Sequence, residues 1–213
     1  MEYVPKALVY QRPEPLTDDD HVIILGSGNK WDDCDYKYET WIVAKMLMMQ
    51  ECRGTEPPKR VDKLYSMDDI DYLLTVRHGS FTKQEFINRI NESGKEYISC
   101  RKHPDIPLSK EYDLGKAINT LPIPYFSNTI CYMIADAIFA GKKSIHLWGV
   151  SQGEKIEYIT ERGGVEFWLG YAIGKGIDVT IHTPNSLLGD RKFVYGYAEP
   201  LVTLQEQGRL GNR

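Results

Sequence analysis

The chain has 213 residues, of which 42% are hydrophobic, so it can bury one substantial core and is expected to form one main domain. Lys and Arg number 26 against 30 Asp and Glu, a formal net charge of −4, which lacks the basic excess typical of tight nucleic-acid binding. The longest apolar stretch, around Ile130 to Ala140, contains Asp136 and is too short to cross a bilayer, so no membrane association is expected.

The four cysteines show neither a C-x-x-C pair nor a histidine at zinc spacing, and the sequence has no signal-peptide pattern. These features predict reduced thiols, no metal centre and a cytoplasmic protein. The cysteines are Cys34, Cys52, Cys100 and Cys131.

Composition divides the chain into three parts. Residues 1–20 carry three prolines and end in three aspartates, which predicts an N-terminal arm. The main domain is expected over 21–198. Residues 199–213, polar from Gln205 onward, are expected to form a C-terminal tail or an arm that joins copies in a homo-oligomer.

Hydrophobic periodicity predicts an alternation of strands and helices along the chain. The N-cap residues before 129 and the glycines at 94 and 141 mark helix ends. Such an alternation favours an α/β fold with a mostly parallel sheet, and two apolar strands, 22–25 and 144–150, are expected to lie near each other in its middle. Strands are predicted over 22–25, 40–44, 61–65, 96–100, 144–150 and 177–182, and helices over 81–93, 129–140 and 166–174.

A glycine-rich turn, Gly26-Ser27-Gly28-Asn29, follows the first predicted strand. Glycine lets the backbone approach a ligand closely, and the N-terminus of a following helix would hold an anion, so the turn indicates a nucleotide site. Trp31 stands where the dinucleotide fingerprint needs a third glycine, which disfavours a nicotinamide cofactor. Lys30 is not followed by Ser or Thr, so the phosphate loop of ATPases is absent; a plain structural turn is the alternative.

Other polar loops also follow predicted strands, and in open α/β sheets these loops carry the ligand site. Asp68 and Asp69 either cap a helix or contact a ligand. Ser127, Asn128 and Thr129 are a helix cap that can also hold a phosphate or ribose. The remaining candidates are Gly149 and Ser151 after the strand 144–150, and Asn185 and Ser186 after the last strand.

Polar residues precede the helix predicted over 166–174. If the helix continues backwards, Glu161 or Arg162 and then Tyr158 lie on its core-facing stripe and need partners. If Gly163-Gly164 marks its true start, Arg162 and the glycine turn form an anion-binding mouth instead. A surface loop without function is the third alternative. His146 and His182 lie within strands and are expected to be structural.

Three segments carry a resemblance to known families: ILGSGN, SNTICYMIADAIFAGKKSIHLWGV and IDVTIHTPNSLL. In that order they resemble bacterial sialyltransferases and MptE-like 6-hydroxymethylpterin diphosphokinases, and the stretch Glu157 to Ala172 is similar to a pattern in uncharacterised bacteriophage proteins. The resemblance covers about 21–188 and implies a Rossmann-like three-layer domain. It also implies nucleotide contacts from 26–29, 127–129 and Asn185-Ser186, and the host cytoplasm as location if the protein is phage-encoded.

The sialyltransferases use a histidine as base, whereas residues 151–164 contain none. Asp68, Tyr158 or Glu161 would then serve as acid or base. We therefore expect a nucleotide-dependent transferase, glycosyltransferase-like or diphosphokinase-like, that uses a nucleotide sugar or nucleoside triphosphate with or without Mg²⁺. The alternatives are a non-catalytic nucleotide-binding phage accessory or counter-defence protein, and a structural protein that retains the fold.

Overall fold

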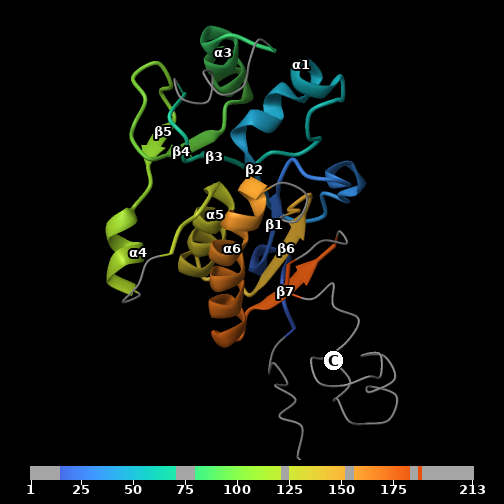
Figure 1. Ribbon diagram of the computed structural model, residues 1–213, viewed down its shortest axis with the longest axis vertical. Helices are drawn as coiled ribbons and strands as arrows, with labels where there is room; N and C mark the ends of the chain where they lie inside the picture. The colour runs from blue at the N-terminus through green and yellow to red at the C-terminus, as the bar shows by residue number, and fades with distance from the viewer. Residues whose placement is uncertain (1–14, 71–79, 121–124, 152–155, 183–186, 189–213) are drawn as a thin grey trace, which may run out of the picture.

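The computed structural model describes residues 15–70, 80–120, 125–151, 156–182 and 187–188 (Figure 1). Seven parallel strands in this part of the chain form one sheet in the order β5-β4-β3-β2-β1-β6-β7. With helices packed on the sheet, the architecture is the predicted α/β, Rossmann-like, three-layer fold. The strands are β1 (His21–Leu25), β2 (Thr40–Val43), β3 (Lys63–Ser66), β4 (Glu96–Ser99), β5 (Ser109–Glu111), β6 (Ser144–Trp148) and β7 (Asp178–Ile181).

The sheet is covered by different helices on its two faces. Val22, Ile24, Ile145 and Leu147 point toward α5 and α6 and share one buried cluster with residues of those helices. Ile23 and Leu25 point the other way, into a cluster with η3, α1 and α3. The helical elements are η1 (Asp18–Asp20), η2 (Trp31–Asp33), η3 (Ala44–Met48), α1 (Met49–Arg53), α3 (Lys83–Ser93), α4 (Leu114–Thr120), α5 (Thr129–Phe139) and α6 (Ile156–Gly174).

Strands β1 and β6, predicted to lie near each other in the middle of the sheet, are hydrogen-bonded neighbours inside it. His21 stands opposite Ser144, and Leu25 opposite Trp148. Side chains on both faces of β1 are buried, which is the burial that its continuous apolar run requires.

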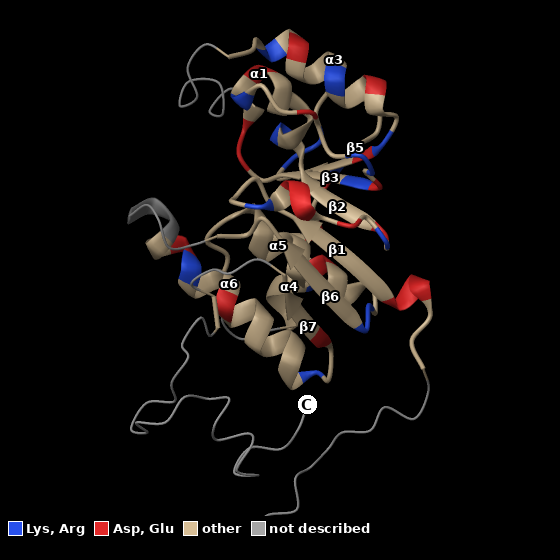
Figure 2. Cartoon of the chain, turned by 90° about the vertical axis from the view of Figure 1, so that its right-hand side faces the viewer, with Lys and Arg blue, Asp and Glu red and all other residues tan. Residues whose placement is uncertain are grey.

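Helix α3 lies within the helix predicted over 81–93 and ends at Gly94, as expected. Thr82 accepts a hydrogen bond from the backbone N–H of Glu85 at its start, and Gly94 ends it with a positive φ of 61°. Phe86 and Ile90 are buried, while acidic and basic residues alternate along the outer surface of the helix (Figure 2).

Among the described elements, three α-helices and one strand differ from the prediction, and one of these helices, α1, was not predicted, nor was η3 before it. Helix α6 begins at Ile156, ten residues before the predicted start at Glu166, and runs without a break through Gly163 and Gly164. The short β5 and α4 were not predicted, because their sequences show no apolar periodicity. None of the helices within the described ranges combines the length and apolar character needed to span a membrane.

Candidate functional site

The strand order identifies the edge of the sheet where a ligand site is expected. From β1 the chain moves outward through β2 to β5, then returns to place β6 on the other side of β1. The connections after β1 and β6 therefore leave in opposite directions. In open α/β sheets the crevice at such a point, beyond the carboxyl ends of the strands, is the usual ligand site.

The loops that follow β1 and β6 are packed directly on each other. The backbone N–H of Gly26 donates to the Trp148 carbonyl at 2.9 Å, and that of Gly28 donates to the Gly149 carbonyl at 2.6 Å. A Cβ atom at Gly28 would lie 2.5 Å from the Gly149 carbonyl oxygen and 2.6 Å from Ser151 Oγ. The glycines are thus required for contact between two loops.

This packing changes the interpretation of the glycine turn. The positive φ values in the loop pair are at Gly149 (61°) and Lys30 (58°), not at Gly28. The helix that follows the turn is η2, a three-residue 3₁₀ helix, so the long helix N-terminus expected to hold an anion here is absent from this loop. Ser27 lies between the two glycines, and Asn29 lies between Gly28 and η2.

A second group of candidate residues meets at the start of α5. Asn128 caps this helix, its side-chain oxygen accepting from the backbone N–H of Cys131 at 3.2 Å. Its amide nitrogen donates to Glu161 Oε2 at 2.9 Å, across 33 positions of sequence. Ser127 Oγ donates to the Glu161 backbone carbonyl at 2.5 Å. The N-terminus of α5 and the Glu161 carboxylate are therefore held together at the edge of the sheet where the strands end.

The loop after β3 joins the same group. The backbone N–H of Met67 donates to Thr129 Oγ1 at 3.3 Å, which places Asp68 next to the N-terminal turn of α5. The neighbouring Asp69 forms an ion pair with Arg101 from the loop after β4. Asp68, Asp69 and His103 line a cavity of about 30 Å³, a volume suited to a single water molecule.

Arg162 lies on α6 with a partner of its own. Its Nε donates to Glu166 Oε1 at 2.7 Å, and the backbone N–H of Leu188 donates to the same oxygen at 3.0 Å. Because α6 is helical through both glycines, the predicted anion-binding mouth at Gly163-Gly164 is wrong, and the backward continuation of the helix is the correct alternative.

The two glycines instead allow α6 to approach the segment that precedes α5. A Cβ atom at Gly163 would lie 2.9 Å from the Tyr125 hydroxyl, and one at Gly164 would overlap Ser127 Oγ. Trp168 Nε1 donates to the Tyr125 carbonyl at 2.8 Å one turn further along. The close contact made possible by Gly163 and Gly164 brings Ser127 and Asn128 within reach of Glu161.

Cys131 is buried below this cluster. Burial raises the pKa of its thiol, so the group stays protonated near neutral pH. Its sulfur lies 3.5 Å from Ser127 Oγ and donates to Asn128 Oδ1 at 3.3 Å. A thiolate nucleophile is therefore disfavoured, and the thiol helps to orient Asn128.

The structure thus joins some of the predicted residues and separates others. It brings Ser127, Asn128, Thr129 and Glu161 together and pairs Gly26 and Gly28 with Gly149 and Ser151. Asn185, Ser186 and the side chain of Tyr158 lie outside the described residues. The described part of the chain holds no group of three or more His, Cys, Asp or Glu side chains placed to bind a metal ion.

Sequence reasoning did not find Tyr125 and Glu166, which hold α6 and Arg162 in place. The spacing of Arg162 and Glu166, four residues apart on a helix, indicates such a pair once the helix is known to continue. No protein-family model matches the chain, and a search of the curated proteins finds no similar sequence.

Proposed function

We propose that this protein binds a nucleotide or nucleotide sugar beyond the carboxyl ends of β1 and β6 and transfers a group from it, as a glycosyltransferase-like or diphosphokinase-like enzyme. The observation that carries the proposal is the hydrogen bond between Asn128 and Glu161. It fixes a carboxylate beside the N-terminus of an eleven-residue helix, at the edge of the sheet where such folds bind ligands.

Each half of this pair has a part in the proposed transfer. The N-terminus of α5 carries a partial positive charge that favours a phosphate near Ser127, Asn128 and Thr129. The Glu161 carboxylate accepts the proton of the acceptor hydroxyl as that oxygen forms its bond to the transferred group. The nucleotide leaves with the electrons of the broken bond. If the transfer required Mg²⁺, Asp68 would be the residue to offer it a carboxylate oxygen, the kind of ligand that this ion prefers, with the second oxygen of Glu161 as a further ligand.

The test begins with the full-length protein and a panel of nucleotides, nucleotide sugars and pterin substrates. A ligand at 100 times its Kd should stabilise the protein by about 2.7 kcal/mol in a thermal-shift measurement. With the ligand identified, Glu161→Gln should slow turnover by about 10²–10⁴-fold while the Kd stays within about threefold. Glu92→Gln on α3, which removes an exposed carboxylate on the other face of the sheet, should keep wild-type turnover.

A non-catalytic nucleotide-binding protein, such as a phage accessory or counter-defence protein, is the second candidate. The absence of histidine from 151–164 favours it. Tight nucleotide binding without turnover of any substrate, with Glu161→Gln changing affinity alone, would select this candidate. Absence of any stabilising ligand would exclude both.

A further inference from the structure

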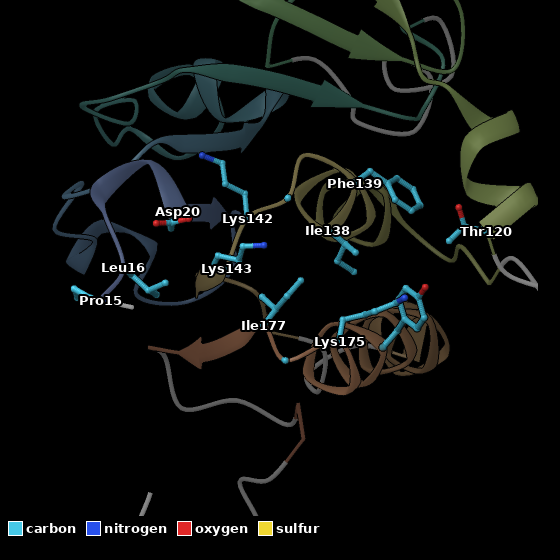
Figure 3. Close-up of a pocket in the computed structure, with 13 residues that line it drawn as sticks. Pro15, Leu16, Asp20, Thr120, Ile138, Phe139, Lys142, Lys143, Lys175 and Ile177 are labelled. Atoms are coloured by element: carbon cyan, nitrogen blue, oxygen red, sulfur yellow. The ribbon is translucent and has the colours of Figure 1, made fainter. Parts of the chain in front are cut away.

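A cavity of about 580 Å³ opens at the opposite edge of the sheet from the candidate site (Figure 3). Lys142 and Lys143 line it directly before β6, Gly176 and Ile177 before β7, and Asp20 before β1. Because these three strands are parallel, their first residues share the amino edge. The volume falls within the range of about 300–1,000 Å³ that is usual for small-molecule sites.

The inner surface of this cavity is apolar. Ile138 and Phe139 come from the last turn of α5, Tyr171 from α6, and Ile177 from the connection to β7. Ile138, Phe139 and Tyr171 are only partly buried by the rest of the protein, so they keep surface to offer a ligand. Leu16 adds an aliphatic side chain from the segment before β1.

The rim of the cavity is basic, with three lysines against one aspartate. Lys142 is engaged in the fold, since its Nζ lies 2.6 Å from Glu39 Oε2 and donates to the Asp19 carbonyl at 2.7 Å. The Asp20 carboxylate accepts from the backbone N–H and the hydroxyl of Thr17 at 2.8 Å each, and these hydrogen bonds, followed by the charge of nearby Lys143, lower its pKa.

Lys143 and Lys175 are exposed and lie on either side of Ile138 and Ile177 in Figure 3. Lys175 Nζ lies 5.4 Å from the centroid of the Tyr171 ring. An anionic group of a ligand held by either ammonium group at this rim would leave the rest of the molecule against the apolar inner surface.

Lysines near helix C-termini also complement the partial negative charge there. The C-terminal ends of α5 and α6 are already capped by backbone hydrogen bonds that follow a glycine with a φ of 78°. The N–H of Lys142 donates to the Ala137 carbonyl, and the N–H of Ile177 donates to the Ala172 carbonyl, each at 3.0 Å. Helix capping therefore does not explain why an apolar cavity lies beside these lysines.

We propose that this cavity binds a small organic anion, an aromatic or aliphatic body that carries one sulfonate, carboxylate or phosphate group.

The experiment uses two fluorescent probes that share one apolar body. 8-Anilino-1-naphthalenesulfonate carries a sulfonate, and N-phenyl-1-naphthylamine is the same molecule without it. Titration of the full-length, folded protein should show saturable sulfonate binding at one site per chain, with the neutral probe at least tenfold weaker. The Lys143→Gln/Lys175→Gln double variant should weaken the sulfonate about tenfold or more and leave the neutral probe unchanged, since each lost charge-assisted contact costs up to tenfold.

Lys37→Gln is the matched control. Lys37 is likewise exposed and has its Nζ 4.9 Å from the centroid of a tyrosine ring, that of Tyr38, but it does not line the cavity. This variant should bind both probes like the wild type. Equal affinity for the two probes, sulfonate binding that survives the double variant, or the same loss in Lys37→Gln would each overturn the proposal. None of these results depends on the transferase activity.

Discussion

His21 on β1 and His146 on β6 are joined by a hydrogen bond between their rings, with Nδ1 of His21 3.0 Å from Nε2 of His146. His146 Nδ1 lies 3.0 Å from His182 Nε2 in turn, so three imidazoles form one row across adjacent strands. Tyr38 stacks on His21 at one end, with centroids 4.1 Å apart, and Trp148 stacks on His182 at 4.2 Å at the other. The row lies on the face of the sheet opposite α5 and α6.

The histidine row makes stability depend on pH. Burial, with the neighbouring charges of His182 and His21, lowers the pKa of His146 to about 4, and burial also lowers the pKa of His21 and His182. Below about pH 6.5 the unfolded chain binds more protons at these three histidines than the folded row does, so the free energy of unfolding should fall as pH drops from 6.5 toward 4. Above pH 6.5 the row contributes no pH dependence.

His146→Gln should reduce this loss by roughly 1–2 kcal/mol, a figure discounted for the partial exposure of the ring. Urea unfolding of wild type and variant at several pH values between 4.5 and 7.5 measures it. His103→Gln, which removes an imidazole outside the row, is the control. Parallel pH profiles for wild type and His146→Gln would contradict the expected effect.

Gly149→Ala should destabilise the protein by about 3 kcal/mol. A side chain there has a strained positive φ of 61°, and its Cβ would overlap the Gly26 carbonyl oxygen and lie 2.5 Å from Trp31 Cβ. Gly141→Ala separates the two causes, because Gly141 has a φ of 78° with no atom within 4 Å of its Cβ position. Gly141→Ala should lower the free energy of unfolding by only about 1 kcal/mol. If chemical denaturation gave equal losses for Gly141→Ala and Gly149→Ala, the contact between the two loops would be unimportant for stability.

Two glycines of α6 should respond to alanine in opposite directions. Gly170 has open space around its Cβ position, so Gly170→Ala should stabilise the protein by up to about 1 kcal/mol through helix propensity. Gly164→Ala gains the same propensity but overlaps Ser127, so we expect a net loss of about 1–3 kcal/mol and weaker binding of the ligand identified for the candidate site. Thermal unfolding of the two variants compares them directly, and stabilisation by both would rule out the close contact.

Tyr65→Phe should cost about 1.5–3 kcal/mol. The buried Tyr65 hydroxyl donates to the Asp136 carboxylate on α5, and its removal takes away a hydrogen bond to a charged group. Tyr132→Phe removes a hydroxyl from the same helix, from a half-buried ring that stacks on Phe126, and should cost under about 0.5 kcal/mol. Equal effects of the two substitutions on the urea midpoint would exclude a special role for the Tyr65 hydroxyl.

Strand β1 could be predicted because both of its faces are buried from Val22 to Leu25, and β6 because Ile145 and Leu147 are buried on one face while His146 and Trp148 are partly buried on the other. Val22 to Leu25 form a continuous apolar run, and Ile145 and Leu147 alternate with His146, and both patterns are typical of strands. Strand β5 is Ser-Lys-Glu with two exposed side chains, and it is held by pairing with β4 rather than by apolar burial. Its sequence therefore carries no strand pattern.

The site was harder to predict because its contacts join distant positions. Gly163-Gly164 resembles a helix start when propensity alone is considered. Packing against Tyr125 and Ser127 keeps these glycines helical, and this contact is visible only in three dimensions. Likewise, the turn at Gly26 resembles a ligand loop in sequence, and its partner at Gly149 lies more than a hundred residues away.

The return of the chain from β5 to β6 has a consequence for the order of assembly. Strands β1 to β5 pair with neighbours close in sequence, whereas Ser144 pairs with His21 across more than a hundred positions of sequence. Such long-range closure is entropically expensive and slow. We expect the strands up to β5 to dock first, with β6, α6 and β7 added last. The two glycine loops and the Asn128–Glu161 pair would then form in the final step of folding. A ligand that binds at this site would therefore bind only molecules that have finished folding.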